Sequence, residues 1–167
     1  NIFGIHLLPM HPAGVVGYHS GHSMAGRAYL KVEIQGRGGH GSSPHKANDA
    51  IVAGAYFVTA AQTIVSRRLN PFDMGVITIG SFDGKGTFNV IRDHVTLEGD
   101  IRYMSNETKE IIETELRRIA AGIEAEFGVR CELTFVPDYP PLYNDPEVTA
   151  FVKKCLENAN DPDIQEV

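Results

Sequence analysis

The sequence is poor in cysteine, lacks long apolar runs and carries no excess of basic residues. Its two cysteines in 167 residues are too few for a disulfide framework and are typical of a reducing compartment, so we expect a cytoplasmic protein. No apolar run approaches the roughly 18 residues of a membrane span, and no signal-peptide pattern opens the chain. The net charge of −6 argues against a basic nucleic-acid footprint. We therefore expect a soluble globular protein with neither a nucleic-acid nor a membrane partner.

The length of 167 residues fits one domain, or one domain with pieces of another, at about 150 residues per domain. A chain of this length can bury a real core, and its 43% of apolar residues is ordinary for a globular protein, which excludes disorder. The chain begins with Asn1 rather than Met and ends abruptly at Val167. From these ends we expect a fragment of a longer protein.

The apolar pattern predicts four strands and two long helices in the middle of the chain. The strands are expected at residues 28–35, 74–82, 94–102 and 129–135, and the helices at 49–68 and 105–127. Asn48 or Asp49 can cap the first helix and Ser105 the second. The order strand, helix, strand, strand, helix, strand is that of a ferredoxin-like βαββαβ domain. We therefore predict an α+β fold with a four-stranded antiparallel sheet and both helices on one face.

Each helix has a stripe of residues that we expect to face the core. In the first helix the stripe is Ile51, Ala55, Val58, Gln62 and Val65. In the second it is Ile112, Leu116, Ile119, Ile123 and Phe127.

The two ends of the chain do not fit this domain and look like flanks of another one. Residues 2–9 are expected to form a short apolar strand, and 138–145 a Pro-rich connection. A third helix is expected from Pro146 to about Asn158, capped by Asp145.

Two histidines lie in unusual surroundings. His6 stands within the apolar segment 2–9, and strand ends in α/β enzymes are where ligands and metals bind. The alternative is a histidine that binds no metal and has ordinary hydrogen-bond partners. A single histidine cannot hold zinc, which needs three or four ligands. His40 lies among the glycines of residues 36–45, where the backbone can approach a ligand closely. That run is either a flexible connection or a loop whose imidazole donates a hydrogen bond to developing negative charge.

Two further polar residues have a functional and an ordinary interpretation. Asn89 lies between apolar neighbours and is either a turn residue or a ligand-binding amide. Arg102 lies on the polar face of its strand beside Glu98 and Asp100. It either forms a surface ion pair, which contributes little to stability, or binds a carboxylate through two parallel hydrogen bonds.

Seven segments of the sequence are specific in combination, although none of them is specific alone. They are GIHLLP at 4–9, SMAG at 23–26, GRGGHGSSPH at 36–45, DAIVAGAYFVTAAQTIVSR at 49–67, FNVI at 88–91, LEGDIR at 97–102 and YPPLYND at 139–145. In this order and spacing the sequence resembles the zinc-dependent aminoacylase and carboxypeptidase family, in its branch of hippurate hydrolases and indole-acetyl-amino-acid hydrolases. The resemblance implies an α/β catalytic domain with a two-metal site and an inserted lid or dimerisation domain. Residues 25–137 would then be the lid domain, with 1–24 and 138–167 as flanks from the catalytic domain.

The resemblance also implies a role for individual residues. His6 matches a metal ligand in the family's Gly-x-His-x-x-Pro segment. His40 matches the lid histidine that reaches the partner subunit's active site and stabilises the oxyanion. Asn89 and Arg102 match lid residues that bind the carboxylate end of the substrate. His45 matches a second histidine of the loop, with a structural role.

The family's other metal ligands do not occur in this sequence. They come from a His-x-Cys-Gly-His-Asp segment, a Glu-Glu pair and a late histidine, and Arg92 stands where the family usually has proline. We therefore expect two divalent metal ions, zinc or else manganese or cobalt, in the parent enzyme, and no tightly bound metal in this chain. The expected reaction is hydrolysis of the amide bond of an N-acyl amino acid or short peptide by a metal-activated water, with a glutamate outside the chain as base. The chain by itself is expected to be inactive.

Two further expectations concern partners. The strand at 74–82 is apolar on both faces and lies at a sheet edge in the predicted order, where it can pair with its two-fold mate in a homodimer. A non-enzymatic ferredoxin-like module for small-molecule binding or assembly is the alternative function, because fold alone does not decide function.

Overall fold

The computed structural model describes residues 2–159 and 163–166, which form two compact units. The sheet unit is Met24–Pro141, and the flanking unit comprises the described residues of Asn1–Ser23 and Leu142–Val167. Residues 1, 160–162 and 167, which belong to the predicted flanks, lie outside the described part of the chain. Among the described residues, no helix is both long and apolar enough to cross a membrane.

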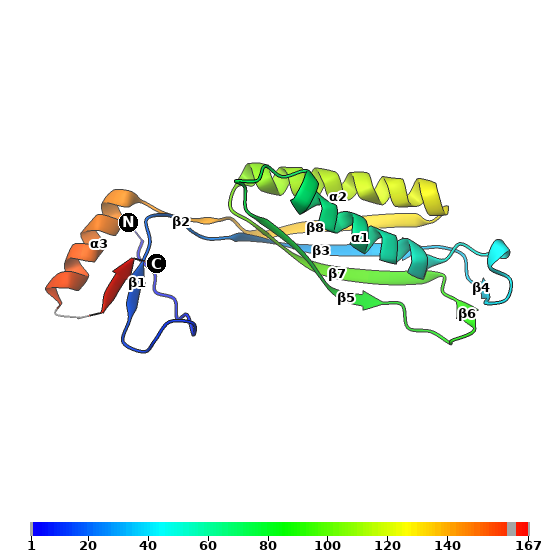
Figure 1. The fold of residues 1–167 in the computed structure, drawn as a ribbon, viewed down its shortest axis with the longest axis horizontal. Coiled ribbons are helices and arrows are strands. Elements are labelled where there is room, and N and C mark those ends of the chain that lie inside the picture. The colour runs from blue at the N-terminus through cyan, green and yellow to red at the C-terminus, as the bar shows by residue number, and fades with distance from the viewer. Residues whose placement is uncertain (1, 160–162, 167) are drawn as a thin grey trace. The chain divides into compact units, whose positions relative to one another are not determined.

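A four-stranded sheet with the order β5-β7-β3-β8 is the base of the sheet unit (Figure 1). Its strands are β3 (Gly26–Gln35), β5 (Gly75–Asp83), β7 (His94–Tyr103) and β8 (Arg130–Tyr139). All three neighbouring pairs are antiparallel, and β5 and β8 are the edge strands. The predicted ferredoxin-like α+β fold, with its second strand at an edge, is therefore confirmed.

Two helices cover one face of this sheet (Figure 1): α1 (Ala50–Arg67) and α2 (Asn106–Phe127). The Asp49 carboxylate accepts two backbone N–H groups at the start of α1, and the Ser105 hydroxyl accepts one at the start of α2. After α2 the chain turns at Gly128, whose φ of +63° lies in the left-handed region that glycine favours. The predicted capping residues are thus confirmed.

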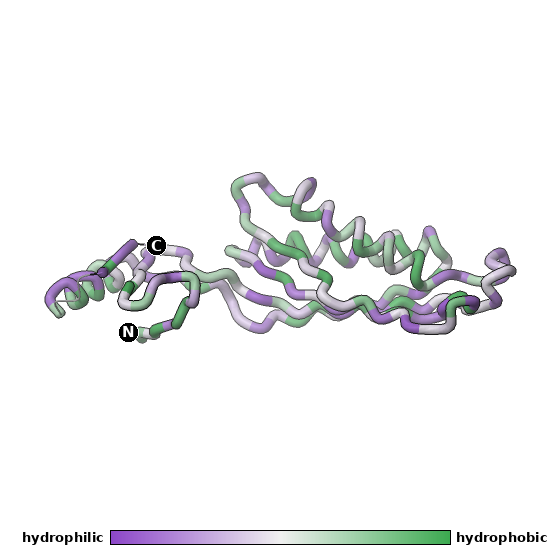
Figure 2. The backbone as a smooth tube through the Cα atoms, turned by 60° about the horizontal axis from the view of Figure 1, so that its bottom comes forward, coloured by the Kyte–Doolittle hydropathy of each residue, from purple (hydrophilic) through white to green (hydrophobic). Residues whose placement is uncertain are grey.

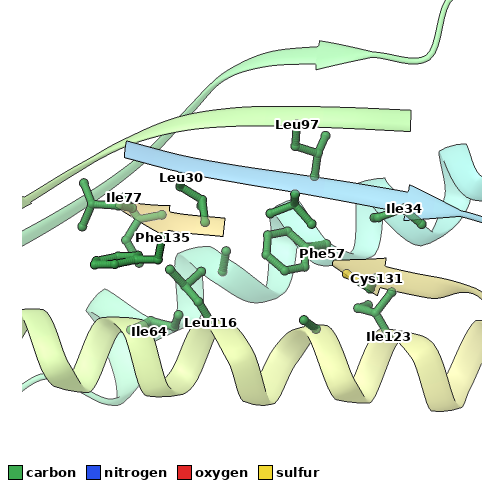
Figure 3. Packing of buried hydrophobic residues seen from close by; sticks show 14 of the residues in the cluster. Leu30, Ile34, Phe57, Ile64, Ile77, Leu97, Leu116, Ile123, Cys131 and Phe135 are labelled. Carbon is green, nitrogen blue, oxygen red and sulfur yellow. The ribbon is translucent and has the colours of Figure 1, made fainter. Parts of the chain in front are cut away.

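The core lies between the helices and the sheet (Figure 3). Apolar and polar residues alternate along the strands (Figure 2), and on β3 the inward residues are fully buried: Ala28, Leu30, Val32 and Ile34. Phe57 of α1 and Leu116 of α2 fill the space between these residues and the helices. The opposite face of the sheet carries polar side chains, including Arg102, and neither helix covers it.

We expect Phe57→Ala to destabilise the sheet unit by roughly 3–5 kcal/mol, because it removes a fully buried ring and leaves a cavity under α1. Urea unfolding followed by circular dichroism measures the change. The exposed Thr59 on the same helix gives the matched control, since Thr59→Ala should change stability by less than about 1 kcal/mol. Equal stabilities of the two variants would contradict the described core.

The predicted core stripe of α1 is wrong. The buried residues are Ala50, Ala53, Gly54, Phe57, Ala61 and Ile64, whereas Ile51 and Val65 of the predicted stripe are 40% and 37% exposed. At 100° per residue the predicted stripe lies roughly 110°, almost a third of a turn, from the buried one. The helix is apolar on both faces, so periodicity alone could not choose between them. The predicted stripe of α2 is largely confirmed, with Ile112, Leu116 and Ile123 buried.

The flanking unit has short strands and one helix. Strand β1 (Val16–Tyr18) pairs in parallel with β10 (Ile164–Glu166), and β2 (Gly21–Met24) pairs with β9 (Leu142–Asn144). Helix α3 is Pro146–Asn158, and Asp145 caps it as predicted. Within the described residues of this unit, no side chain is buried.

The strand predicted at residues 2–9 is not formed, and this segment has no regular structure. A strand is stable only when a neighbouring strand accepts its backbone hydrogen bonds, and apolar character cannot supply that neighbour. Residues 138–145, predicted as a connection, are instead largely extended, because β8 continues to Tyr139 and β9 follows.

Candidate functional site

The glycine-rich loop that carries His40 is an ordered part of the sheet unit. Its strand β4 (Gly39–His40) pairs antiparallel with β6 (Val90–Ile91), so that His40 lies opposite Val90. Residues 39–40 of this run are therefore part of a strand pair, and the role of His40 stays a prediction. Strands β4 and β6 lie together at the end of the sheet where β3 ends and β7 begins (Figure 1).

This strand pairing brings Asn89 next to His40. The backbone N–H of Gly41 donates to the carbonyl oxygen of Asn89 at 2.8 Å. A Cβ atom at Gly41 would lie 3.0 Å from the same oxygen, so glycine permits this close approach. Two residues that are far apart in sequence thus share one end of the sheet.

The base of the loop is closed by backbone hydrogen bonds. The N–H groups of Arg37 and Asn48 donate to each other's carbonyls at 3.0 and 2.8 Å. The Asn48 amide also donates to the carbonyl of Phe127 at the end of α2, at 2.9 Å. These bonds anchor the His40 loop to the helical layer and reduce the entropy that the loop would lose on binding a ligand.

The ring of His40 has a defined tautomer. Its Nδ1 accepts the backbone N–H of Ser42 at 3.2 Å and lies 2.8 Å from the Ser42 hydroxyl. Because a backbone N–H can only donate, Nδ1 carries no proton and the hydroxyl also donates to it. In the neutral ring the proton is therefore on Nε2, which leaves a hydrogen-bond donor free to point away from the loop.

Arg102 lies on the open face of the sheet and is held by two side chains. Its Nε donates to Oδ2 of Asp100 at 2.6 Å, and its Nη1 donates to the Tyr139 hydroxyl at 2.8 Å. The other carboxylate oxygen of Asp100 accepts from Nε of Arg27 at 2.7 Å. Burial raises the pKa of Asp100, but the hydrogen bonds from Arg102 and Arg27 outweigh it and hold that pKa below its ordinary value. The carboxylate therefore stays charged at neutral pH.

The structure does not bring Arg102 to His40 and Asn89 within one copy of the chain. Arg102 lies near the far end of β7, roughly 26 Å from His94 at about 3.3 Å per residue, and His94 begins the strand beside the His40 loop. A small substrate cannot span that distance. The predicted lid residues therefore form two separate groups at opposite ends of the sheet.

His6 is exposed in the flanking unit, and its Nδ1 lies 2.8 Å from the carbonyl oxygen of Leu7. In the described part of the chain, no group of three or more His, Cys, Asp or Glu side chains could hold a metal ion. The described residues alone therefore do not make up a two-metal centre, and the metal-ligand role of His6 stays a prediction. Burial raises the pKa of Cys131 to about 12, so this thiol stays protonated at neutral pH and is a poor nucleophile.

The structure reveals contacts of the candidate residues that were missed from the sequence. Ser42 lies two residues from His40, and Asp100 two residues from Arg102 on the same face of β7, so local spacing could have indicated both. Tyr139 and Arg27 lie on other strands, and only the register of the sheet places them beside Arg102.

Comparison with known proteins gives a family and several relatives. A family model for a peptidase dimerisation domain matches residues 22–128. The N-acetyldiaminopimelate deacetylase of Shouchella clausii is 40% identical over 147 residues, which cover 88% of this chain and 39% of that protein. The deacetylase of the same name from a Geobacillus species is 35% identical and covers 94% of this chain and 42% of that protein. The chain thus spans about two fifths of the length of these curated relatives.

Solved structures share the fold. A protein from methicillin-resistant Staphylococcus aureus, assigned as an aminohydrolase, is 56% identical with a TM-score of 0.86 over 96% of this chain and 42% of that one. The Bacillus subtilis structure described as a dinuclear metal-binding peptidase of the M20 family has a TM-score of 0.73 over 97% of this chain and 39% of that one. Its identity is 22%, so it shows the fold alone.

Proposed function

From the premise that the chain belongs to the M20 peptidase dimerisation-domain family, we propose that it provides the lid of a metal-dependent amidohydrolase acting on N-acyl amino acids. The names of its relatives support this reaction, since a deacetylase of N-acetyldiaminopimelate removes an acyl group from the nitrogen of an amino acid. In this proposal the substrate has an amide to be cleaved and a carboxylate to be recognised.

The pairing of β4 with β6 is the observation that carries the proposal. It sets the imidazole of His40, with its proton on Nε2, at the same end of the sheet as Asn89. The Nε2 proton of His40 is positioned to donate to the oxygen that becomes negative when water adds to the amide carbonyl. A single donor of this kind lowers the barrier by about 3 kcal/mol. Asn89 binds the substrate on the same side, and Arg102 binds its carboxylate through parallel hydrogen bonds.

The separation of Arg102 from His40 makes the proposed site a composite of two subunits. Because roughly 26 Å of sheet divides the two groups, one lid cannot place both on a single N-acyl amino acid. We propose that Arg102 of one subunit and the partner's His40 and Asn89 act on the same substrate molecule. A homodimer is then required for catalysis, and each dimer has two equivalent sites.

The proposed dimer contact combines the edge strand β5 with the exposed stripe of α1. Ile51 lies against the end of β5, since a Cβ atom at Gly84 would be 3.2 Å from its Cγ1. The stripe continues to Val65, and Met74 and Phe82 at the two ends of β5 are 67% and 41% exposed. A free strand edge beside an apolar helix stripe is a surface that a second copy can cover by strand pairing and helix packing together.

We also propose that the flanking unit is part of the catalytic domain, as the division into 1–24, 25–137 and 138–167 implies. Its parallel pair of β1 and β10 supports this, because parallel strands are stable almost solely when both faces are covered. Exposed apolar side chains such as Ile2, Ile5 and Leu7 are available to be covered by the rest of that domain.

The two proposed metal ions, zinc or else manganese or cobalt, would lie in the catalytic domain with His6 as one ligand. The free Cys131 and Cys155 agree with the proposed cytoplasmic location.

The test is hydrolysis by the full-length protein that contains this chain. We expect the metal-loaded protein to cleave N-acetyl and N-benzoyl amino acids, and to cleave the matching amino acid amides much more slowly because these lack the carboxylate. The 167-residue chain alone should be inactive. Binding of such compounds by the full-length protein without turnover would favour the alternative function, a non-enzymatic binding or assembly module.

A further inference from the structure

We infer that Tyr139 is a positioning residue that, with Asp100, fixes the plane of the Arg102 guanidinium and presents its outer pair of N–H groups to the substrate carboxylate. This inference rests on the proposed role of Arg102 as the carboxylate-binding residue. Tyr139 was not among the predicted site residues and lies on β8, whereas Arg102 lies on β7. The hydrogen bonds on the open face of the sheet support its role.

A count of the donors on Arg102 shows what is left for a ligand. A guanidinium has five N–H groups, one on Nε and two on each Nη. Asp100 takes the Nε donor at 2.6 Å, and the Tyr139 hydroxyl takes one donor of Nη1 at 2.8 Å. One N–H on Nη1 and both on Nη2 remain. These nitrogens form the outer edge of the group, which can bind a carboxylate with two parallel hydrogen bonds.

Asp100 is itself held in place and therefore cannot follow Arg102 if the arginine rotates. Its Oδ1 accepts from Nε of Arg27 at 2.7 Å, and its Oδ2 is left for Arg102. Arg27 is the cross-strand neighbour of Arg102 on β3, and it also lies 3.4 Å from Asp138. The two carboxylates balance the two guanidinium groups, so a substrate carboxylate is recognised by the geometry of Arg102 and not by a large local excess of positive charge.

Tyr139 stands on a rigid backbone. The hydroxyl of Tyr103, a residue that is only 1% exposed, lies 3.2 Å from the carbonyl oxygens of both Tyr139 and Arg27 and shares its one proton between them. Register places Arg102, Arg27 and Tyr139 side by side on β7, β3 and β8. The phenol that contacts Arg102 is thus anchored from below by a buried side chain.

Fixing the guanidinium matters because an arginine side chain has many rotamers to lose on binding. A free arginine would lose about 2 kcal/mol of rotamer entropy when it binds a ligand. Hydrogen bonds on two edges of the guanidinium restrict it before the substrate arrives, so less is lost. Removing the Tyr139 hydroxyl should therefore weaken substrate binding without changing the chemistry of the amide.

The experiment is Tyr139→Phe in the full-length protein. We expect KM for an N-acetyl amino acid to rise by about 3- to 10-fold with kcat nearly unchanged. KM for the matching N-acetyl amino acid amide should not change, because that compound lacks the carboxylate. Tyr29→Phe is the matched control, since the Tyr29 hydroxyl also hydrogen-bonds a carboxylate, that of Glu98, on the same face without contacting Arg102. This control should retain the wild-type KM.

Two comparisons separate this inference from the proposed function. If Arg102→Leu leaves KM for the carboxylate substrate unchanged, the proposed role of Arg102 is wrong and the inference falls with it. If Arg102→Leu raises KM and Tyr139→Phe does not, the positioning role alone is wrong. A second readout uses the 167-residue chain: the ¹⁵N relaxation of the Arg102 Nε–H should show greater mobility in Tyr139→Phe than in Tyr29→Phe. Equal mobility in the two variants would overturn the inference.

Discussion

His40→Ala in the full-length protein should lower kcat for N-acyl amino acid hydrolysis by about 100- to 1,000-fold and leave KM nearly unchanged. The imidazole donates from Nε2 to an oxygen that is negative only after water has added to the amide, so the transition state loses more than the bound substrate does. Steady-state kinetics with an N-acetyl amino acid measure both constants. The anchoring of the loop through Asn48 keeps its fold independent of this side chain.

His45→Ala is the matched control for His40→Ala. His45 is an exposed histidine of the same loop, in the short 3-10 helix Pro44–Lys46, and its proposed role is structural. We expect this variant to keep kcat within about 3-fold of the wild-type value. A His40→Ala protein with wild-type kcat would show that the imidazole does not stabilise the transition state.

The double variant Ile51→Lys/Val65→Lys should convert the dimer into a monomer and lower kcat by about 100-fold or more. Both side chains lie on the exposed stripe of α1 beside β5, and they are 40% and 37% exposed. Two lysines on each subunit would face their copies across a two-fold contact, where like charges repel and the apolar contact is lost. Since the proposed site takes His40 from the partner, loss of the dimer removes the oxyanion donor as well.

Sedimentation velocity and the hydrolysis assay together test this prediction. Val52→Lys is the control, because Val52 is 41% exposed on the same helix but faces away from the sheet, about 100° around the helix from Ile51. We expect it to remain dimeric and active. A double variant that becomes monomeric yet keeps full activity would refute the composite site, and one that remains dimeric would refute this interface.

Local sequence patterns were enough to predict most of the sheet unit. The capping residues Asp49 and Ser105 and the alternation of apolar and polar residues along β3 depend only on neighbours a few residues away. They define elements whose order leaves few ways to form one sheet. The position of β5 at the edge followed from that order alone, and the structure confirms it.

Features that depend on distant partners were not predictable in the same way. The prediction of the core-facing residues of α1 was wrong because the helix is apolar on two faces, and periodicity does not show which face packs on the sheet. The strand expected at residues 2–9 failed because the apolar pattern says nothing about a pairing neighbour. Both errors concern surfaces that we propose are covered by other parts of the assembly.

The candidate site also combines residues that local motifs predict with contacts that depend on distant parts of the chain. His40, Asn89 and Arg102 were selected from sequence motifs, which do not show how far apart the residues lie in space. Only the pairing of β4 with β6 places Asn89 beside His40. The length of β7 separates these residues from Arg102, which made a composite site necessary in the proposal. The contact of Tyr139 with Arg102 arises from register across three strands and has no local sequence signature.

The most direct test of the composite site is complementation between two variants that each lack one residue of the proposed site. His40→Ala and Arg102→Leu subunits of the full-length protein are co-expressed with different affinity tags, and the mixed dimer is isolated by both tags. If the partner supplies His40, one of the two sites in the mixed dimer has both residues intact, and activity should return to about half of the wild-type value. If His40 and Arg102 of the same subunit formed each site, both sites would lack one residue and the mixed dimer would show no more activity than its parents.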